Sequence, residues 1–126
     1  MKQILIVDDN QDLRGIFELA AQDMDLKVIF CDSGEEALTK ISEDDSNIDA
    51  ALVDLAMYPM DGTSLIELIR SNEKVKLKAE MPIAIYTAQV VDDVIRDIQK
   101  ENNVHKVFFK PSDPFRLLEE VRLWLH

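Results

Sequence analysis

The sequence is poor in cysteine, glycine and proline, and these shortages exclude several classes of protein. Its single cysteine, Cys31, excludes an intramolecular disulfide and fits a reducing compartment. Cys31 ends an apolar run, so we interpret it as a buried, unreactive thiol. With three glycines, four prolines and 47% hydrophobic residues, the composition is that of a globular protein and not of a disordered chain. The length fits one domain over residues 1–126.

Basic residues are also scarce. The chain has 14 Lys and Arg against 25 Asp and Glu, a formal net charge of -11. This charge opposes direct binding to nucleic acid or to an anionic membrane, because both gain affinity from basic side chains. The apolar run before Asp8 has only four residues, too few for a signal peptide or a membrane span. We therefore expect a cytoplasmic protein.

Five short apolar runs predict five strands. They are continuous and not alternating, which is typical of parallel strands covered on both faces. The runs are Ile4–Val7, Leu26–Cys31, Ile48–Val53, Ile83–Tyr86 and Val104–Phe109.

Helical periodicity fills the gaps between these runs and follows the last one. Apolar residues recur at helical spacing from Leu13 to Met24, and four further stripes follow. Ser33 to Glu36 reads as a capping box, and Asp113-Pro114 as the start of the last helix. The polar stretch 71–80 reads as a loop. The order is therefore (βα) repeated five times, an α/β fold with helices on both faces of the sheet. The further stripes are Ala37, Leu38 and Ile41; Leu65, Ile66, Leu68 and Ile69; Val91, Val94, Ile95 and Ile98; and Leu117, Leu118, Val121, Trp124 and Leu125.

Chemically active side chains stand at four strand ends, the edge where open α/β sheets bind ligands. Asp8 and Asp9 follow the first strand, Asp54 the third, Thr87 the fourth and Lys110 the fifth. Crowded carboxylates repel unless a cation compensates their charge, and Mg²⁺ prefers such oxygen ligands. A carboxylate can also form an aspartyl phosphate, whose oxygens a metal and a lysine neutralise. Each residue alone has a simple structural explanation; their coincidence favours function.

Four stretches, IVDDN, VDLAMYPMDG, YTA and KPSDPF, together resemble the receiver domain of two-component response regulators, as in chemotaxis receivers. The resemblance covers essentially the whole chain. It implies a flavodoxin-like (βα)5 sandwich, doubly wound, whose five parallel strands lie in the order 2-1-3-4-5.

The resemblance also implies a role for each site residue. Asp54 falls at the phosphoacceptor position. Asp9 falls at the position of a direct Mg²⁺ (or Mn²⁺) ligand and Asp8 at that of a ligand acting through water, while the backbone carbonyl of Ala56 completes the metal shell with Asp54. Thr87 falls at the switch hydroxyl and Lys110 at the lysine that pairs with the phosphoryl group. The Lys110–Pro111 bond is expected to be cis, as X-Pro bonds permit.

Three positions depart from the family pattern. Val107 stands where an aromatic residue usually couples to the switch hydroxyl, and its two Phe neighbours differ in pleat position. Tyr58 takes the place of the usual loop proline, with Pro59 following it, and Ser112 replaces a hydrophobic residue after Lys-Pro. These departures concern the output mechanism and the loop, since no chemical group of the site is lost.

The implied function is a phosphorylation-activated switch. A sensor histidine kinase or a phosphotransfer protein would donate the phosphoryl group, and a downstream protein or an effector domain outside this sequence would respond. Such a domain catalyses its own phosphorylation and dephosphorylation and turns over no external substrate. Homodimerisation on phosphorylation stays open. We interpret His105, at a strand start, and His126, at the chain end, as structural and not as phosphorelay histidines.

Two other classes of function stay open. One is a phosphorylation-independent module for protein–protein interaction, against which the full set of site residues argues. The other is a Mg²⁺-dependent phosphohydrolase with Asp54 as nucleophile. It ranks lowest, because Ala56 stands where a second aspartate would act as general acid.

Overall fold

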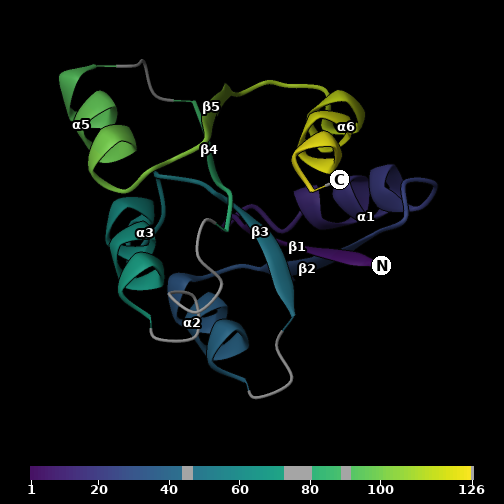
Figure 1. Ribbon diagram of the computed structural model, residues 1–126, viewed down its shortest axis with the longest axis horizontal. Coiled ribbons are helices and arrows are strands. Elements are labelled where there is room, and N and C mark those ends of the chain that lie inside the picture. The colour runs from purple at the N-terminus through teal and green to yellow at the C-terminus, as the bar shows by residue number, and fades with distance from the viewer. Residues whose placement is uncertain (44–46, 73–80, 89–91, 126) are drawn as a thin grey trace.

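The computed structural model describes residues 1–43, 47–72, 81–88 and 92–125, and its strands form one parallel sheet (Figure 1). The strand order is β2-β1-β3-β4-β5, which confirms the flavodoxin-like topology. The apolar runs are continuous because both faces of the sheet are buried under helices. The strands are β1 (Lys2–Val7), β2 (Leu26–Cys31), β3 (Ile48–Val53), β4 (Ile83–Thr87) and β5 (Lys106–Phe109).

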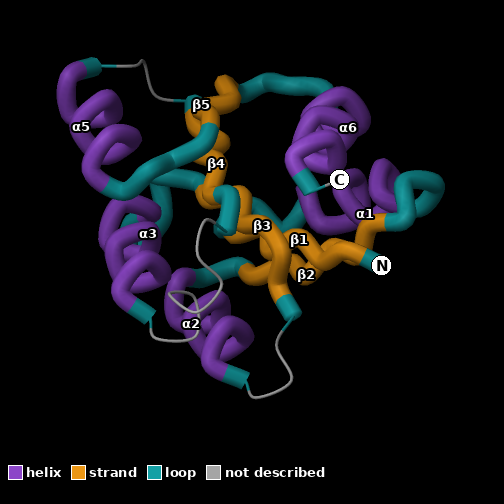
Figure 2. Tube along the Cα trace, in the orientation of Figure 1, coloured by secondary structure: helices purple, strands orange, loops and turns teal. Residues whose placement is uncertain are grey.

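Helices cover both faces of the sheet (Figure 2). On one face, α1 (Leu13–Ala21) and α6 (Pro114–Trp124) pack side by side. The other face carries α2 (Gly34–Ser42), α3 (Gly62–Ser71) and α5 (Asp93–Glu101). In the described ranges, no helix combines the length and the apolar character needed to cross a membrane.

The core has two halves, one on each side of the sheet, because successive side chains of a strand point to opposite faces. The half under α2, α3 and α5 takes the odd-numbered strand residues Leu5, Val7, Ala51, Val53, Ile83 and Ile85. The half under α1 and α6 takes the even-numbered residues Ile4, Ile6, Ala50, Leu52, Ala84, Tyr86 and Phe108. This alternation decides which side chains of neighbouring strands can meet at the functional edge.

The predicted helix starts are largely confirmed. The Ser33 hydroxyl accepts a hydrogen bond from the Glu36 N–H at 3.1 Å. The Glu36 carboxylate accepts from the N–H of Asp32, one residue before the position that a capping box requires. Asp113 caps α6 through its side chain, with Pro114 in the first turn.

Three residues of the predicted apolar stripes are exposed and not buried. They are Ile16 on α1, Leu68 on α3 and Val94 on α5, the last with 64% of its surface accessible. A helix that packs on a sheet buries only the side facing the strands, and these residues lie at the margin of each stripe. Val91, residues 73–80 of the predicted loop and His126 lie outside the described residues.

The last strand begins two residues later than predicted, at Lys106. Asn103 adopts a left-handed conformation with φ of 51°, and the Val104 N–H donates to the Gln99 carbonyl at 2.8 Å. Val104 therefore closes the C-terminus of α5 in place of starting the strand. His105, expected at a strand start, lies just before β5 with its ring 4.2 Å from that of Trp124.

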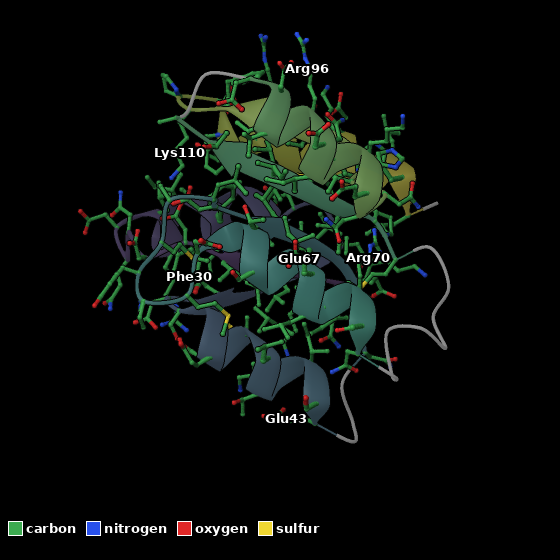
Figure 3. The ribbon with its side chains drawn as sticks, turned by 90° about the vertical axis from the view of Figure 1, so that its left-hand side faces the viewer. Phe30, Glu43, Glu67, Arg70, Arg96 and Lys110 are labelled. Atoms are coloured by element: carbon green, nitrogen blue, oxygen red, sulfur yellow. The ribbon has the colours of Figure 1, made fainter. Side chains whose placement is uncertain are left out.

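One arginine, at the end of the sheet remote from Lys110, joins α3 to the end of α5 and to the segment before β4 (Figure 3). Arg70, in the last turn of α3, donates to the carbonyls of Asn102 and Met81, both at 2.8 Å, and to that of Asn103 at 3.0 Å. Two of these carbonyls belong to the C-terminus of α5, where helix carbonyls lack partners within the helix. The guanidinium therefore serves as the C-terminal cap of a neighbouring helix.

Replacing Arg70 by methionine is expected to lower the free energy of unfolding by about 2 kcal/mol, because three hydrogen bonds to a charged group are lost and their acceptors are partly buried. Urea denaturation measures the change. The matched control is Arg96→Met on α5, whose guanidinium is exposed and lies 3.9 Å from the Asp93 carboxylate. That variant should change stability by less than about 0.5 kcal/mol. Equal effects at the two sites would contradict the capping interpretation.

Candidate functional site

The residues predicted to be functional meet at the carboxyl edge of the sheet. Asp8 and Asp9 follow β1, Asp54 follows β3, Thr87 ends β4 and Lys110 follows β5. Because all five strands are parallel, their carboxyl ends lie at the same edge.

Backbone hydrogen bonds extend the sheet one residue beyond these strands and hold the site residues in place. The Asp54 N–H donates to the carbonyl of Val7 at 2.9 Å, and the Asp8 N–H donates to that of Cys31 at 3.1 Å. The Lys110 N–H donates to the Thr87 carbonyl at 2.8 Å. The side chains therefore start from rigid backbone, as a site with defined geometry requires.

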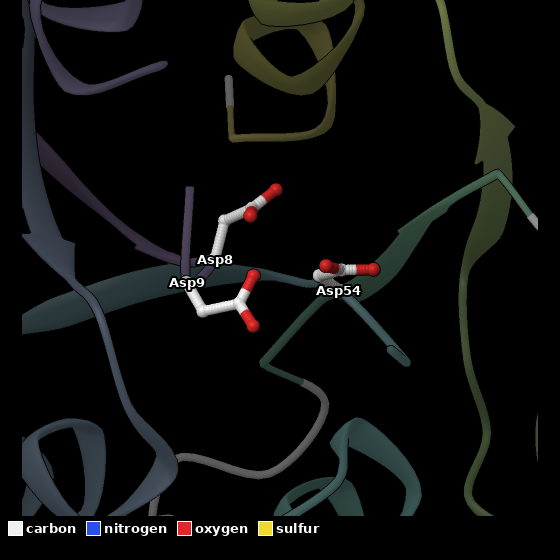
Figure 4. Close-up of side chains that lie close together, drawn as sticks. All are labelled: Asp8, Asp9 and Asp54. Carbon is white, nitrogen blue, oxygen red and sulfur yellow. The ribbon is translucent and has the colours of Figure 1, made fainter. Parts of the chain in front are cut away.

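The three carboxylates form a compact group (Figure 4). Asp8, Asp9 and Asp54 each offer one oxygen, and these oxygens all lie within 4.8 Å of one another. Asp8 and Asp54 are buried, Asp54 with 4% of its surface accessible, while Asp9 is exposed. The Lys110 ammonium lies 2.6 Å from Asp8 Oδ2 and 3.5 Å from Asp54 Oδ2. It joins the two buried acids.

Burial and neighbouring charges shift the pKa values of Asp54 and Lys110. Burial raises the pKa of Asp54, and the Asp8 charge adds to this, while the Ala56 N–H at 3.2 Å and Lys110 oppose it. Burial acts to lower the pKa of Lys110, but its hydrogen bond to Asp8 and the nearby charge of Asp54 outweigh that effect and raise it. Lys110 therefore stays charged, and Asp54 is an unusually basic carboxylate.

The remaining two predicted site residues, Thr87 and Ala56, lie at the end of β4 and in the loop after Asp54. Thr87 is fully buried at the end of β4. Ala56 lies in the loop directly behind Asp54 and is exposed, and its N–H donates to Asp54 Oδ1. Its carbonyl stays a predicted ligand.

The loop after Asp54 is held by Gly62, the first residue of α3. The Gly62 N–H donates to the Leu55 carbonyl at 3.0 Å. A Cβ on Gly62 would lie 2.1 Å from the backbone oxygen of Asp54. The preceding Asp61 caps α3 by accepting from the Ser64 N–H at 2.8 Å. The start of α3 and the backbone that follows β3 are therefore in direct contact at Gly62, with no side chain between them.

The three departures from the family pattern now have a structural description. Tyr58 is 87% exposed, and the Tyr58–Pro59 bond is cis, as is Lys110–Pro111. Val107 is half-buried against the core under α5, and the Ser112 hydroxyl donates to a backbone carbonyl at the end of β5. The two Phe residues beside Val107 differ as predicted: Phe108 is buried under α6, and Phe109 is 47% exposed.

Cys31 is buried, as expected of an unreactive thiol. Burial raises its pKa to about 12, with the Glu36 charge contributing. Only a thiolate reacts as a nucleophile or binds a metal, so this thiol takes no part in the chemistry of the edge.

Sequence reasoning did not single out Tyr86, whose ring centre lies 5.0 Å from the Lys110 ammonium. The signal was available in principle, because Tyr86 precedes Thr87 and strand alternation places its side chain on one known face. Predicting the contact with Lys110 also requires knowing that Tyr86 of β4 is paired with Phe108 of β5, and the sequence alone does not give this pairing.

Comparison with known proteins agrees with this geometry. The family model for the response regulator receiver domain matches residues 4–122. The chain is 29% identical over 124 residues to the CAI-1 autoinducer sensor kinase/phosphatase CqsS of Vibrio cholerae, covering 98% of this chain and 17% of that protein. It is also 29% identical to the transcriptional regulatory protein GltR of Pseudomonas aeruginosa, covering 98% of this chain and 49% of that protein. The chain thus spans about half or less of these relatives.

A solved structure has the same fold. The CheY-like receiver domain of Methanospirillum hungatei superposes with a TM-score of 0.82 at 25% identity, covering 99% of this chain and 94% of that one.

Proposed function

The chain belongs to the response regulator receiver domain family of two-component systems, and from this membership we propose that residues 1–126 form one receiver domain that is phosphorylated on Asp54. One observation carries the proposal. Three carboxylates offer oxygens within 4.8 Å of one another, and Lys110 contacts the two buried ones.

The proposed reaction transfers a phosphoryl group from a phosphohistidine of the partner. An Asp54 carboxylate oxygen attacks phosphorus, a P–O bond forms, and the P–N bond to the histidine ring breaks with its electron pair going to nitrogen. Asp54 must be ionised to attack, and its raised pKa makes it a better nucleophile than an exposed carboxylate. The Lys110 ammonium, already beside Asp54 Oδ2, would pair with the negative phosphoryl oxygens.

The acidic group fits a divalent cation by its donor chemistry. Its oxygens are the hard ligands that Mg²⁺ or Mn²⁺ prefers, and two of the three carboxylates are buried. Asp9 and Asp54 would bind the ion directly, with the Ala56 carbonyl, and Asp8 would act through water. When bound, the ion neutralises charge on the transferring phosphoryl group.

Phosphorylation would then act as a switch. The phosphoryl group adds about 1.5 to 2 negative charges at neutral pH, to which Lys110 and Thr87 would respond. A near-complete switch requires a bias of about 5.5 kcal/mol between the two states of the surface. With Val107 in place of the usual aromatic residue, we propose a smaller bias over the surface of α5, β5 and α6.

Partners follow from the family. We propose that a sensor histidine kinase or phosphotransfer protein donates the phosphoryl group in the cytoplasm, and that a downstream protein or an effector domain receives the signal, with homodimerisation as a further response. The relatives, a sensor kinase/phosphatase and a transcriptional regulatory protein, carry their matching segments within longer chains. Direct contact of this domain with nucleic acid is disfavoured by its net charge of -11.

Incubation with acetyl phosphate and Mg²⁺, followed by intact mass measurement, tests the proposal. We expect the mass of one phosphoryl group to be added, and the gain to vanish when a chelator replaces Mg²⁺. No gain under any condition would overturn the proposal in favour of a phosphorylation-independent interaction module. Multiple turnovers of phosphate release without a stable gain would instead indicate a phosphohydrolase.

A further inference from the structure

The Lys110 ammonium has a third neighbour besides its two carboxylates. The aromatic ring of Tyr86 has its centre 5.0 Å from Nζ, which is within the range of a cation–π interaction. Asp8 at 2.6 Å is the close partner, and Asp54 at 3.5 Å is a distant one. Tyr86 differs from both because its ring is neutral.

Strand pairing explains why this ring lies beside this lysine. Tyr86 of β4 is paired with Phe108 of β5, and Lys110 stands two residues beyond Phe108. Residues two apart along a strand share a face, and the hydrogen bond from the Lys110 N–H to Thr87 extends the pairing to that point. The Lys110 side chain therefore leaves the sheet on the face that carries the Tyr86 ring.

Packing in the core also fixes the position of the Tyr86 ring. Tyr86 is buried in the core under α1 and α6, where it meets the ring of Phe17 edge-to-face at a centroid distance of 6.0 Å and an angle of 88°. Interiors of this kind are close-packed, so the ring cannot follow the ammonium if the ammonium moves. It provides a stationary apolar and π surface at the edge of the acidic group.

We propose that Tyr86 is a positioning residue for Lys110: its ring face supports the ammonium while Lys110 exchanges Asp8 for the phosphoryl oxygens on Asp54. This inference rests on the proposed function. Leaving Asp8 removes the closest counter-charge of a half-buried cation, and a ring face stabilises the cation without adding negative charge. A further carboxylate in place of the ring would repel the incoming phosphoryl group, whereas a neutral ring does not.

The inference also assigns the two faces of β4 different tasks. Thr87 directly follows Tyr86 in β4. Successive side chains of a strand point to opposite faces of the sheet, so the Thr87 side chain lies on the face opposite to the Tyr86 ring. The predicted switch hydroxyl therefore stands on one side of the strand and the support of the lysine on the other. Changes at Tyr86 should thus act on phosphoryl transfer separately from changes at Thr87.

Three variants test the inference through the rate of phosphorylation by acetyl phosphate with Mg²⁺. Tyr86→Leu removes the ring, and we expect the rate to fall about three- to tenfold, the range of a cation–π contact. Tyr86→Phe keeps the ring face and should stay within about twofold of the wild type. Phe30→Leu is the matched control, because Phe30 lies in the same half of the core on the distant strand β2 and should leave the rate unchanged. Equal rates for Tyr86→Leu and Tyr86→Phe, or an equal loss in Phe30→Leu, would overturn the inference.

A spectroscopic measurement on the unphosphorylated protein separates this inference from the proposed function. A ring above the lysine shifts the NMR signal of the Lys110 ε-methylene group upfield, and this shift should persist in Tyr86→Phe and be lost in Tyr86→Leu. A shift that is absent from the wild type overturns the inference, whatever the phosphorylation result. A wild type that shows the shift and takes up no phosphoryl group would instead refute the proposed function.

Discussion

Replacing Asp54 by asparagine is expected to abolish the gain of a phosphoryl group from acetyl phosphate, because the amide oxygen is a far weaker nucleophile than a carboxylate oxygen. The measurement is the intact mass after incubation with Mg²⁺. The matched control is Asp61→Asn, in the loop that follows. Asp61 caps α3 by accepting a hydrogen bond, which an asparagine side chain also does. The control should be phosphorylated like the wild type, and phosphorylation of Asp54→Asn would show that another residue is the acceptor.

The same variant should unfold at a higher urea concentration than the wild type at neutral pH. Burial and the charge of Asp8 raise the pKa of Asp54 in the folded protein. A carboxyl group whose pKa is raised in the folded protein binds more protons in the folded state than in the unfolded state. The free energy of unfolding therefore falls as pH rises from the unfolded pKa through the folded pKa. Asparagine does not titrate. The advantage of Asp54→Asn should therefore shrink as pH falls through the raised folded pKa of Asp54 and be absent below the unfolded pKa of aspartate. An advantage that is constant with pH would contradict this account.

The fold was predictable because its signals are local and repeated. Continuous apolar runs are typical of strands buried on both faces, and the alternation of strand and helix favours a parallel sheet between two helical layers. The strand order came from the resemblance, since periodicity does not specify which strands are neighbours. Periodicity also does not mark where β5 begins: Val104 is apolar like a strand residue, but its N–H donates to the Gln99 carbonyl at the C-terminus of α5.

The candidate site was predictable as far as it depends on strand ends. Asp8, Asp9, Asp54 and Lys110 meet because parallel strands bring their carboxyl ends together. Contacts that depend on packing between elements could not be foreseen. The three carbonyls that accept from Arg70 belong to the segment before β4 and to the residues that end α5, and no local pattern marks them.

Gly62 is the position where a single methyl group should cost most. A Cβ there would lie 2.1 Å from the Asp54 carbonyl oxygen and 2.7 Å from Leu55 Cα, and both are backbone atoms, which cannot turn away as a side chain can. Gly62→Ala is therefore expected to lower the free energy of unfolding by roughly 3 to 5 kcal/mol. Relief of the clash requires movement of the backbone that carries Asp54, so phosphorylation should slow as well.

The other two glycines supply graded controls for this prediction, measured by urea denaturation. At Gly34 the Cβ would lie 2.6 Å from the Met60 sulfur, the flexible part of a side chain that can turn away, so Gly34→Ala should cost far less than Gly62→Ala. At Gly15, inside α1, nothing lies within 4 Å, and Gly15→Ala should stabilise the protein by about 0.5 to 1 kcal/mol through helix propensity. A Gly62→Ala variant as stable as Gly34→Ala would mean that the loop after Asp54 can move without disturbing the strand. The rigid backbone support proposed for the phosphoacceptor would then be wrong.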